Sequence, residues 1–165
     1  FISDLHVDPY FDPSAFNPKK GICRSSDQKI DPTDSLSNQL SAKAIPYLSC
    51  DPPITLLDSC LSKMKGLDPN PSAILIGGDL TAHDYSDKNM VHVTLLAALS
   101  SVKKHFNRIV FSVGNNDYFP DKFVSSEEID RLSSAVVENG FVEVEDENLK
   151  TLNYGLFYLD EMVNE

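Results

Sequence analysis

The chain has 165 residues and a formal net charge of −11. This acidic balance excludes a basic nucleic-acid footprint, so we expect no nucleic-acid binding through a basic patch. An anionic substrate would be repelled by the same charge unless metal ions or other local positive charge offset it. No apolar run in the sequence approaches the roughly 20 residues that a transmembrane helix needs.

The first part of the chain predicts a short apolar strand followed by a long excursion. Residues 1–4 form the strand, which ends at Asp4. Residues 8–53 are rich in Pro, Ser, Asp and Asn, which predicts a surface loop with a short helix at Asn38–Tyr47. The chain begins at Phe1, already strand-like, and stops soon after an apolar run. We therefore expect residues 1–165 to be one domain, truncated at the carboxyl end and at the amino end.

The remainder alternates between strand and helix patterns. Apolar residues at spacings of three and four indicate helices, and short β-branched runs indicate strands. The predicted elements are a helix from Pro52–Pro53 to about Lys65, a strand at 73–77 buried on both faces, a helix at Asp87–His105, a strand at Arg108–Val113, a helix at Ser126–Glu138 capped by Ser125, and strands at Phe141–Val144 and Leu152–Leu159. This alternation predicts an α/β fold with a largely parallel sheet.

The three cysteines show no C-x-x-C spacing, so a zinc knuckle is not expected. Cys23 and Cys50 lie in loop-like sequence and could pair if the protein is exported, while three free thiols are the alternative. Cys60 falls on the apolar face of a predicted helix, which indicates a buried thiol.

Three predicted strand ends carry polar residues suited to metal binding: Asp4-Leu5-His6, Gly78-Asp79 and Gly114-Asn115-Asn116-Asp117. Ligands of open α/β sheets bind at the carboxyl ends of the strands. In an extended backbone residues i and i+2 share a side, so Asp4 and His6 could hold one ion together. Asp79 follows a glycine, which allows close backbone approach, and Asn115 offers a neutral oxygen. This donor set favours zinc, manganese or iron over calcium.

Two such ions would activate a water and neutralise phosphate oxygens in an in-line displacement. His83 follows Asp79 closely and is suited to protonate a leaving group. Each motif by itself is also compatible with an ordinary turn or with chance. His92 and His105 have no matching partners and fit structural roles. The occurrence of all three motifs in order, each at a strand end, favours the metal site.

With these residues in place, the sequence resembles the calcineurin-like metallophosphoesterases, whose signature runs D-x-H, then G-D, then G-N-H-[DE]. Within that superfamily it is similar to the acid sphingomyelinase-like phosphodiesterases and the related endopolyphosphatases. The further matches are Cys50-Asp51-Pro52-Pro53, Gly78-Asp79-Leu80-Thr81-Ala82-His83-Asp84 and Gly114-Asn115-Asn116-Asp117-Tyr118-Phe119-Pro120. The resemblance covers roughly residues 1–159.

The resemblance implies the amino-terminal half of an αββα sandwich that holds two divalent metal ions, with zinc favoured and manganese or iron as alternatives. It implies a secreted protein or one of the lysosomal or vacuolar lumen, and a Cys23–Cys50 disulfide. Its implied site residues are Asp4 and His6 on the first metal, Asp79 between the metals, Asn115 on the second metal, and His83 near the leaving group.

The chain departs from the family pattern at two points. Asn116 stands where most members carry the histidine of G-N-H, as in the endopolyphosphatase branch, and we count it with His83 among the catalytic candidates. The family's later histidine ligands have no counterpart, because no histidine follows His105. The expected function is metal-dependent hydrolysis of a phosphodiester or phosphoanhydride, in a sphingomyelin-like lipid, a nucleotide or polyphosphate. The alternatives are a non-catalytic binding module of the same fold and an inactive fragment.

Overall fold

The computed structural model describes residues 1–24, 50–119 and 125–141. Its regular elements are η1 (Pro13–Ala15), β1 (Phe16–Asn17), β2 (Ile22–Cys23), α2 (Ile54–Leu67), β3 (Ile74–Ile76), α3 (Lys88–His105), β4 (Ile109–Phe111), η2 (Asn115–Asp117) and α4 (Ser126–Glu138). The predicted helix at Asn38–Tyr47, the strand at Leu152–Leu159 and residues 142–144 lie outside the described residues. Helices and strands alternate from α2 to α4, which is consistent with the predicted α/β class.

A small parallel arrangement of chain segments positions the candidate site. β3 and β4 pair in parallel, and the amino-terminal segment runs parallel to β3 at the bridge from Ile2 to Ile76 and to the loop after β3 at the bridge from Val7 to Thr81. The strand predicted at residues 1–4 is thus reduced to single bridges. Asp4 and His6 adopt positive φ angles of 55° and 43°, and such residues cannot continue an extended strand.

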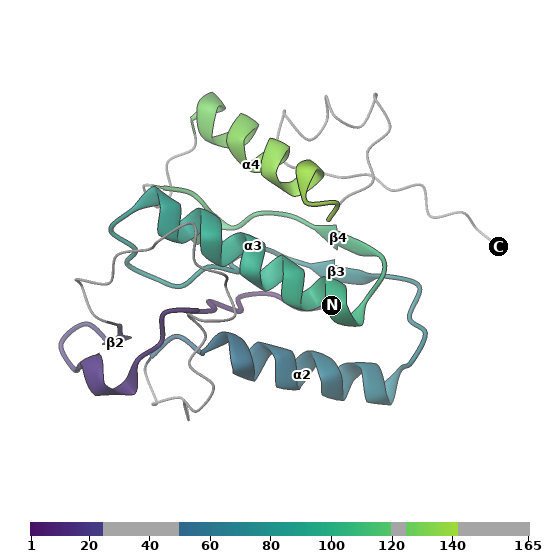
Figure 1. Ribbon diagram of the computed structural model, residues 1–165, viewed down its shortest axis with the longest axis horizontal. Coiled ribbons are helices and arrows are strands. Elements are labelled where there is room, and N and C mark those ends of the chain that lie inside the picture. Colours follow the sequence, from purple (N-terminus) through teal and green to yellow (C-terminus); the bar gives the residue numbers. More distant parts are fainter. Residues whose placement is uncertain (25–49, 120–124, 142–165) are drawn as a thin grey trace.

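Three helices accompany this sheet, and α3 contacts both α2 and α4 (Figure 1). Local capping explains where two of them begin. The Asp87 side chain accepts a hydrogen bond from the Asn89 amide at 2.7 Å, and Ser125 Oγ accepts one from the Glu128 amide at 3.1 Å. The predicted helix at Ser126–Glu138 with its Ser125 cap is therefore confirmed.

The prediction that the central strand is buried on both faces is wrong for the described residues. Ile74 and Ile76 are buried, but Leu75 between them is 46% exposed. Side chains alternate across a strand, so the Ile74–Ile76 face packs into the core while the opposite face stays open. The main core contains Val7, Ile54, Leu57, Leu61, Ile74, Ile76, Leu80, Leu95, Ala97, Ala98, Leu99, Val102, Phe106, Ile109, Phe111, Tyr118, Leu132, Val136 and Phe141.

The burial predicted for Cys60 is also wrong, because its thiol is free and exposed. Leu57 and Leu61 are the buried residues of this part of α2. Cys60 is rotated by about 100° from its neighbour Leu61, which places it beyond the edge of the apolar stripe.

The predicted surface excursion after residue 8 begins inside the fold instead. Tyr10 and Phe11 are 3% and 2% exposed, and the chain then forms a hairpin of β1 and β2, paired antiparallel. Composition alone missed this because two aromatic side chains anchor an otherwise polar segment. Within the described part of the chain, no helix is long and apolar enough to cross a membrane.

Candidate metal centre

Asp4, His6 and Asp79 form a cluster in which one potential ligand atom from each lies within 4.8 Å of the others. The parallel pairing of the backbone brings them together. The Asp4 amide donates to Gly78 O at 3.1 Å, and the His6 amide donates to Asp79 O at 3.0 Å. Two carboxylates and an imidazole form a donor set that suits zinc, manganese or iron.

The backbone of this cluster is unusual. Asp4, His6 and Asp79 have φ angles of 55°, 43° and 52°, and Asp84, at 55°, is the only other non-glycine residue with positive φ in the described segments. We predicted that Asp4 and His6 converge through an extended backbone, and this is wrong. They converge through left-handed backbone whose amides are hydrogen-bonded to the loop after β3. Left-handed backbone costs non-glycine residues energy and concentrates at functional sites.

Hydrogen bonds orient His6 within the cluster. His6 Nδ1 lies 3.2 Å from the carbonyl oxygen of Thr81. A carbonyl oxygen only accepts, so Nδ1 carries the proton and Nε2 keeps its lone pair for a metal. A histidine held by its second nitrogen in this way is the usual arrangement for a metal ligand.

Two glycines allow the loops after β3 and β4 to meet. A Cβ atom at Gly78, where φ is 93°, would lie 2.5 Å from Gly114 N. A Cβ atom at Gly114 would lie 2.5 Å from Asp79 N and would overlap the Asp79 carboxylate. The close approach expected of Gly78 is therefore present, and it depends on Gly114 as well.

Asn115 and Asn116 begin η2 beside Asp79. The Asn116 backbone amide donates to Asp79 Oδ1 at 2.9 Å, and the backbone of Gly114 leaves no room for a Cβ atom beside Asp79. Asn115 is exposed, whereas Asn116 is 6% exposed. Metal binding by Asn115 and a catalytic role for Asn116 stay predictions, and the contact of Asn116 with Asp79 is made by its backbone.

Asp117 joins the two loops, a role that our sequence analysis missed. Its Oδ1 accepts the amides of Leu80 and Thr81 at 2.9 and 3.0 Å, and its Oδ2 accepts the Gly114 amide at 2.8 Å. Burial raises the pKa of Asp117 above its usual value, although these backbone donors oppose the shift. The only sequence signal was a carboxylate at the end of the Gly-Asn-Asn-Asp motif.

His83 lies next to the cluster, because its ring stacks on that of His6 with centroids 4.0 Å apart and planes at 24°. Its side chain is 53% exposed. Asp51 holds it twice: Oδ1 lies 2.9 Å from Nδ1, and Oδ2 accepts the His83 amide at 2.7 Å. The structure thus brings His83 beside the cluster of Asp4, His6 and Asp79, and it gives a role to Asp51, which the sequence had shown only as part of the matched stretch Cys50-Asp51-Pro52-Pro53.

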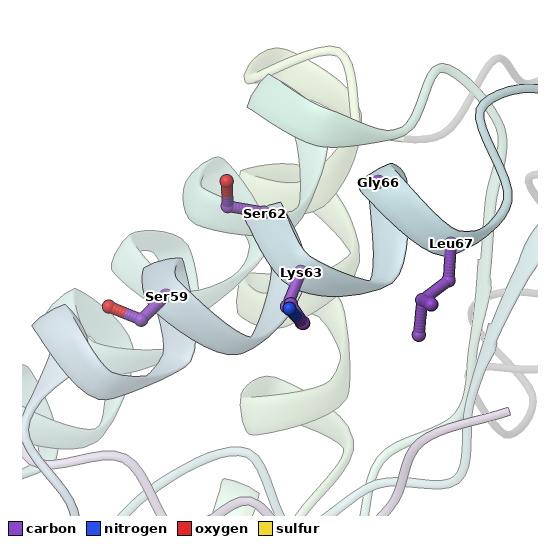
Figure 2. A pocket seen from close by; sticks show the side chains of 5 residues that line it. All are labelled: Ser59, Ser62, Lys63, Gly66 and Leu67. Carbon is purple, nitrogen blue, oxygen red and sulfur yellow. The ribbon is translucent and has the colours of Figure 1, made fainter.

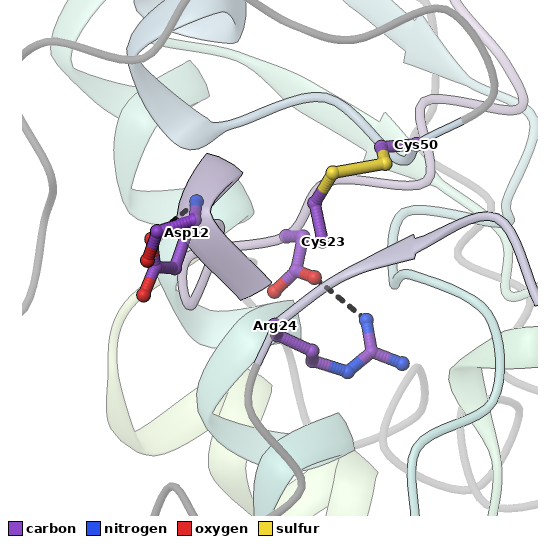
Figure 3. Close-up of a disulfide and its surroundings, with 6 residues drawn as sticks. Asp12, Cys23, Arg24 and Cys50 are labelled. Atoms are coloured by element: carbon purple, nitrogen blue, oxygen red, sulfur yellow. Dashed lines mark hydrogen bonds and ion pairs between the residues drawn. A yellow bond between two sulfur atoms is a disulfide. The ribbon is translucent and has the colours of Figure 1, made fainter. Parts of the chain in front are cut away.

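Behind His83 lies a buried ion pair. Arg24 Nη1 lies 2.6 Å from Asp8 Oδ2, and Nη2 of Arg24 donates to the carbonyl oxygen of His83. The guanidinium also lies 4.3 Å from the centroid of the Tyr85 ring. Beside Arg24, Cys23 forms a disulfide with Cys50 across a Cα–Cα distance of 5.7 Å (Figure 3). This is the pair that the resemblance implied.

Other polar features lie away from this cluster. A hollow of about 320 Å³ on α2 is lined by Ser59, Ser62, Lys63, Gly66 and Leu67, with Lys63 as its single charged residue (Figure 2). It offers no group of ligands or nucleophiles comparable to the cluster.

The two histidines of α3 also lie outside the site. His92 is partly buried, and its Nδ1 is buried without a hydrogen-bond partner among the described residues. His105 Nε2 lies 3.8 Å from Asp58 Oδ1. Neither belongs to the cluster formed with Asp79.

Comparison with known proteins gives one informative similarity. No model of a known protein family matches the chain. The acid sphingomyelinase-like phosphodiesterase 3b of Mus musculus is 27% identical over 169 residues, covering 98% of this chain and 34% of the relative. The chain therefore spans about a third of the length of this relative.

Proposed function

We propose that the chain is the amino-terminal part of a calcineurin-like metallophosphoesterase, and that the whole protein hydrolyses a phosphodiester or phosphoanhydride. The observation that carries the proposal is the convergence of Asp4, His6 and Asp79 on left-handed backbone. Left-handed backbone is unfavourable for non-glycine residues, and here it occurs at the three residues whose ligating side chains converge. An ordinary solvated loop would not be expected to combine these two features. The similarity to a protein named as a phosphodiesterase supports the same class.

The residues of the cluster would divide between two divalent ions, zinc by preference and manganese or iron as alternatives. Asp4 and His6 would bind the first ion, Asp79 both, and Asn115 the second. When bound, such a pair supplies an activated water and positive charge for the phosphate oxygens. The two neighbouring carboxylates also fit a cation, because without one they repel each other.

His83 would serve as the general acid. Asp51 occupies its Nδ1, so Nε2 is the atom that can give a proton to the departing oxygen. Stacking on His6 keeps the imidazole beside the cluster. Asn116 would assist through its backbone amide, which donates a hydrogen bond to Asp79 Oδ1.

The open face of β3 supports the αββα sandwich as the architecture of the whole protein. Leu75 is an apolar side chain exposed on that face, where a second sheet would pack. The substrate would be a sphingomyelin-like lipid, a nucleotide or polyphosphate. The Cys23–Cys50 disulfide favours a secreted protein or one of the lysosomal or vacuolar lumen, because disulfides persist in oxidising compartments.

The proposal is tested with the full-length protein that contains this chain, supplied with Zn²⁺ or Mn²⁺ and bis(p-nitrophenyl) phosphate. Asp79→Asn should lower the rate at least about 100-fold, because it removes the charge shared by the two ions. Asp84→Asn is the matched control: it has the same left-handed φ in the same loop and lies outside the cluster. Asparagine tolerates this backbone, so both variants should fold.

The outcomes separate the enzyme from the alternative of a non-catalytic binding module. A binding module would hydrolyse no ester with either metal. An enzyme in which Asp79→Asn and Asp84→Asn have equal rates would refute the bridging role of Asp79.

A further inference from the structure

His83 is held at three atoms of its residue, which is unusual for a side chain that is 53% exposed. Asp51 accepts its amide and lies against its Nδ1, while Arg24 donates to its carbonyl oxygen. Solvated histidines normally move freely between rotamers. In His83 the backbone and the Nδ1 side of the ring are both hydrogen-bonded to protein groups. These contacts determine the direction in which Nε2 points.

The two residues that hold His83 directly follow the two cysteines of the disulfide. Arg24 follows Cys23, and Asp51 follows Cys50. Arg24 is fixed further by the buried carboxylate of Asp8, which also accepts the Tyr10 amide at 2.9 Å. The disulfide therefore ties together two segments that hydrogen-bond to the backbone amide, the backbone carbonyl and the ring of one residue, His83.

The contact between Asp51 and the imidazole determines which nitrogen can act. An ionised carboxylate only accepts, so His83 Nδ1 carries a proton toward Asp51. The other nitrogen, Nε2, is left for the reaction. In catalytic histidines a carboxylate at this place selects the tautomer and holds the ring in orientation.

We propose that Asp51 is a positioning residue for His83, and that the Cys23–Cys50 disulfide aligns Asp51 and Arg24 on either side of it. The catalytic part of this inference rests on the function proposed above, in which His83 protonates the leaving group. Asp51 itself would not touch the substrate. Its effect should therefore appear only where His83 matters.

Leaving groups of different basicity separate this role from a merely structural one. Full-length protein with Zn²⁺ would be assayed on methyl p-nitrophenyl phosphate, whose leaving group departs without a proton, and on methyl phenyl phosphate, whose leaving group needs one. Asp51→Ala should lower kcat on the phenyl ester about 10- to 100-fold more than on the p-nitrophenyl ester. Asp51→Asn, which keeps an acceptor for Nδ1, should recover part of the loss.

A double-mutant cycle tests whether Asp51 acts through His83. In a His83→Ala background, Asp51→Ala should cause no further loss on the phenyl ester. Asp12→Asn is the control, because Asp12 lies beside the disulfide (Figure 3) and caps η1 through Ser14. In the described part of the chain, the hydrogen-bond and ring-stacking partners of His83 are Asp51, Arg24 and His6, not Asp12. Equal losses on both esters, or a loss that persists without His83, would overturn the proposal.

A readout without turnover separates failure of this inference from failure of the proposed function. In ¹⁵N-labelled metal-free protein, the His83 ring should show an Nδ1-bound proton that Asp51→Ala removes and Asp12→Asn keeps. The paired Cys23→Ser and Cys50→Ser substitutions should weaken the same signal. If neither ester is hydrolysed, the function proposed above fails while this signal still decides the positioning role. A His83 ring whose single proton is on Nε2, with Nδ1 unprotonated, would refute the positioning role.

Discussion

Asp117 provides the sharpest test of how the candidate site is held together. Its carboxylate accepts three amides, those of Leu80 and Thr81 on Oδ1 and that of Gly114 on Oδ2. Leu80 and Thr81 are both 0% exposed, so water cannot replace a lost acceptor there. Replacing this one side chain should therefore weaken the loops after β3 and β4 together.

The hydrogen bonds set the expected magnitude. In Asp117→Asn the amide oxygen can still serve Leu80 and Thr81, but the NH₂ group then faces the Gly114 amide, and two donors cannot bond. One charge-assisted bond is lost, which costs about 1.5–3 kcal/mol. Relief of the buried charge, whose burial raises the pKa of Asp117, offsets part of this. We expect a net loss of about 1–2 kcal/mol in the free energy of unfolding.

Asp117→Ala should be worse, because all three amides lose their acceptor. An unsatisfied buried donor costs about 1–3 kcal/mol, so the expected loss is at least about 3 kcal/mol. Urea denaturation measures both variants. Asp68→Asn is the control, since exposed Asp68 accepts, among the described residues, the Asn70 amide alone at 3.3 Å. Zn²⁺ affinity should fall in the same order, because Asp79 lies in one of the weakened loops. The reasoning would be refuted if Ala and Asn variants were equally stable.

Two further predictions concern packing and pH. Gly114→Ala should lower Zn²⁺ affinity at least about tenfold by displacing Asp79. Gly66→Ala is the control and should leave the affinity unchanged, because a Cβ atom there meets no atom within 4 Å. Equal affinities of the two variants in isothermal titration calorimetry would contradict this prediction. Burial, aided by the charge of Arg131, lowers the pKa of His92 below its ordinary value of 6.5. The unfolded chain therefore binds a proton at His92 more readily than the folded chain does. The free energy of unfolding should fall as pH decreases below about 6.5. His92→Gln should flatten that dependence in hydrogen exchange of α3 and α4, and an unchanged slope would argue against it.

Several features of this protein follow from short stretches of its sequence. The helix at Ser126–Glu138 and its Ser125 cap are recognisable because capping and the 3.6-residue period involve neighbours within one or two turns. The carboxyl ends of the strands are likewise recognisable from neighbouring residues in the sequence. This identified Asp4, His6 and Asp79 as candidate ligands. The structure brings these three residues together, and metal binding by them stays a prediction.

Other features depend on residues far apart in the chain. Leu75 and Cys60 are residue types that are common in protein cores, yet both are exposed. Tertiary packing, not the local sequence pattern, decides which face of a strand or helix is covered. The backbone of Asp4 and His6 turned left-handed because each amide pairs with the loop after β3, more than 70 residues away in sequence.

The arrangement around the candidate acid shows the division most clearly. The sequence alone identified His83 as a candidate, since it closely follows Gly78-Asp79. Only the tertiary structure gave roles to Asp51, Arg24 and Asp117, whose partners in the loop after β3 lie 32, 59 and at least 36 residues away. A carboxylate or guanidinium carries no local sign of which distant amide or carbonyl it will meet. Those pairings are decided by the fold, and they determine how the ligands and His83 are held.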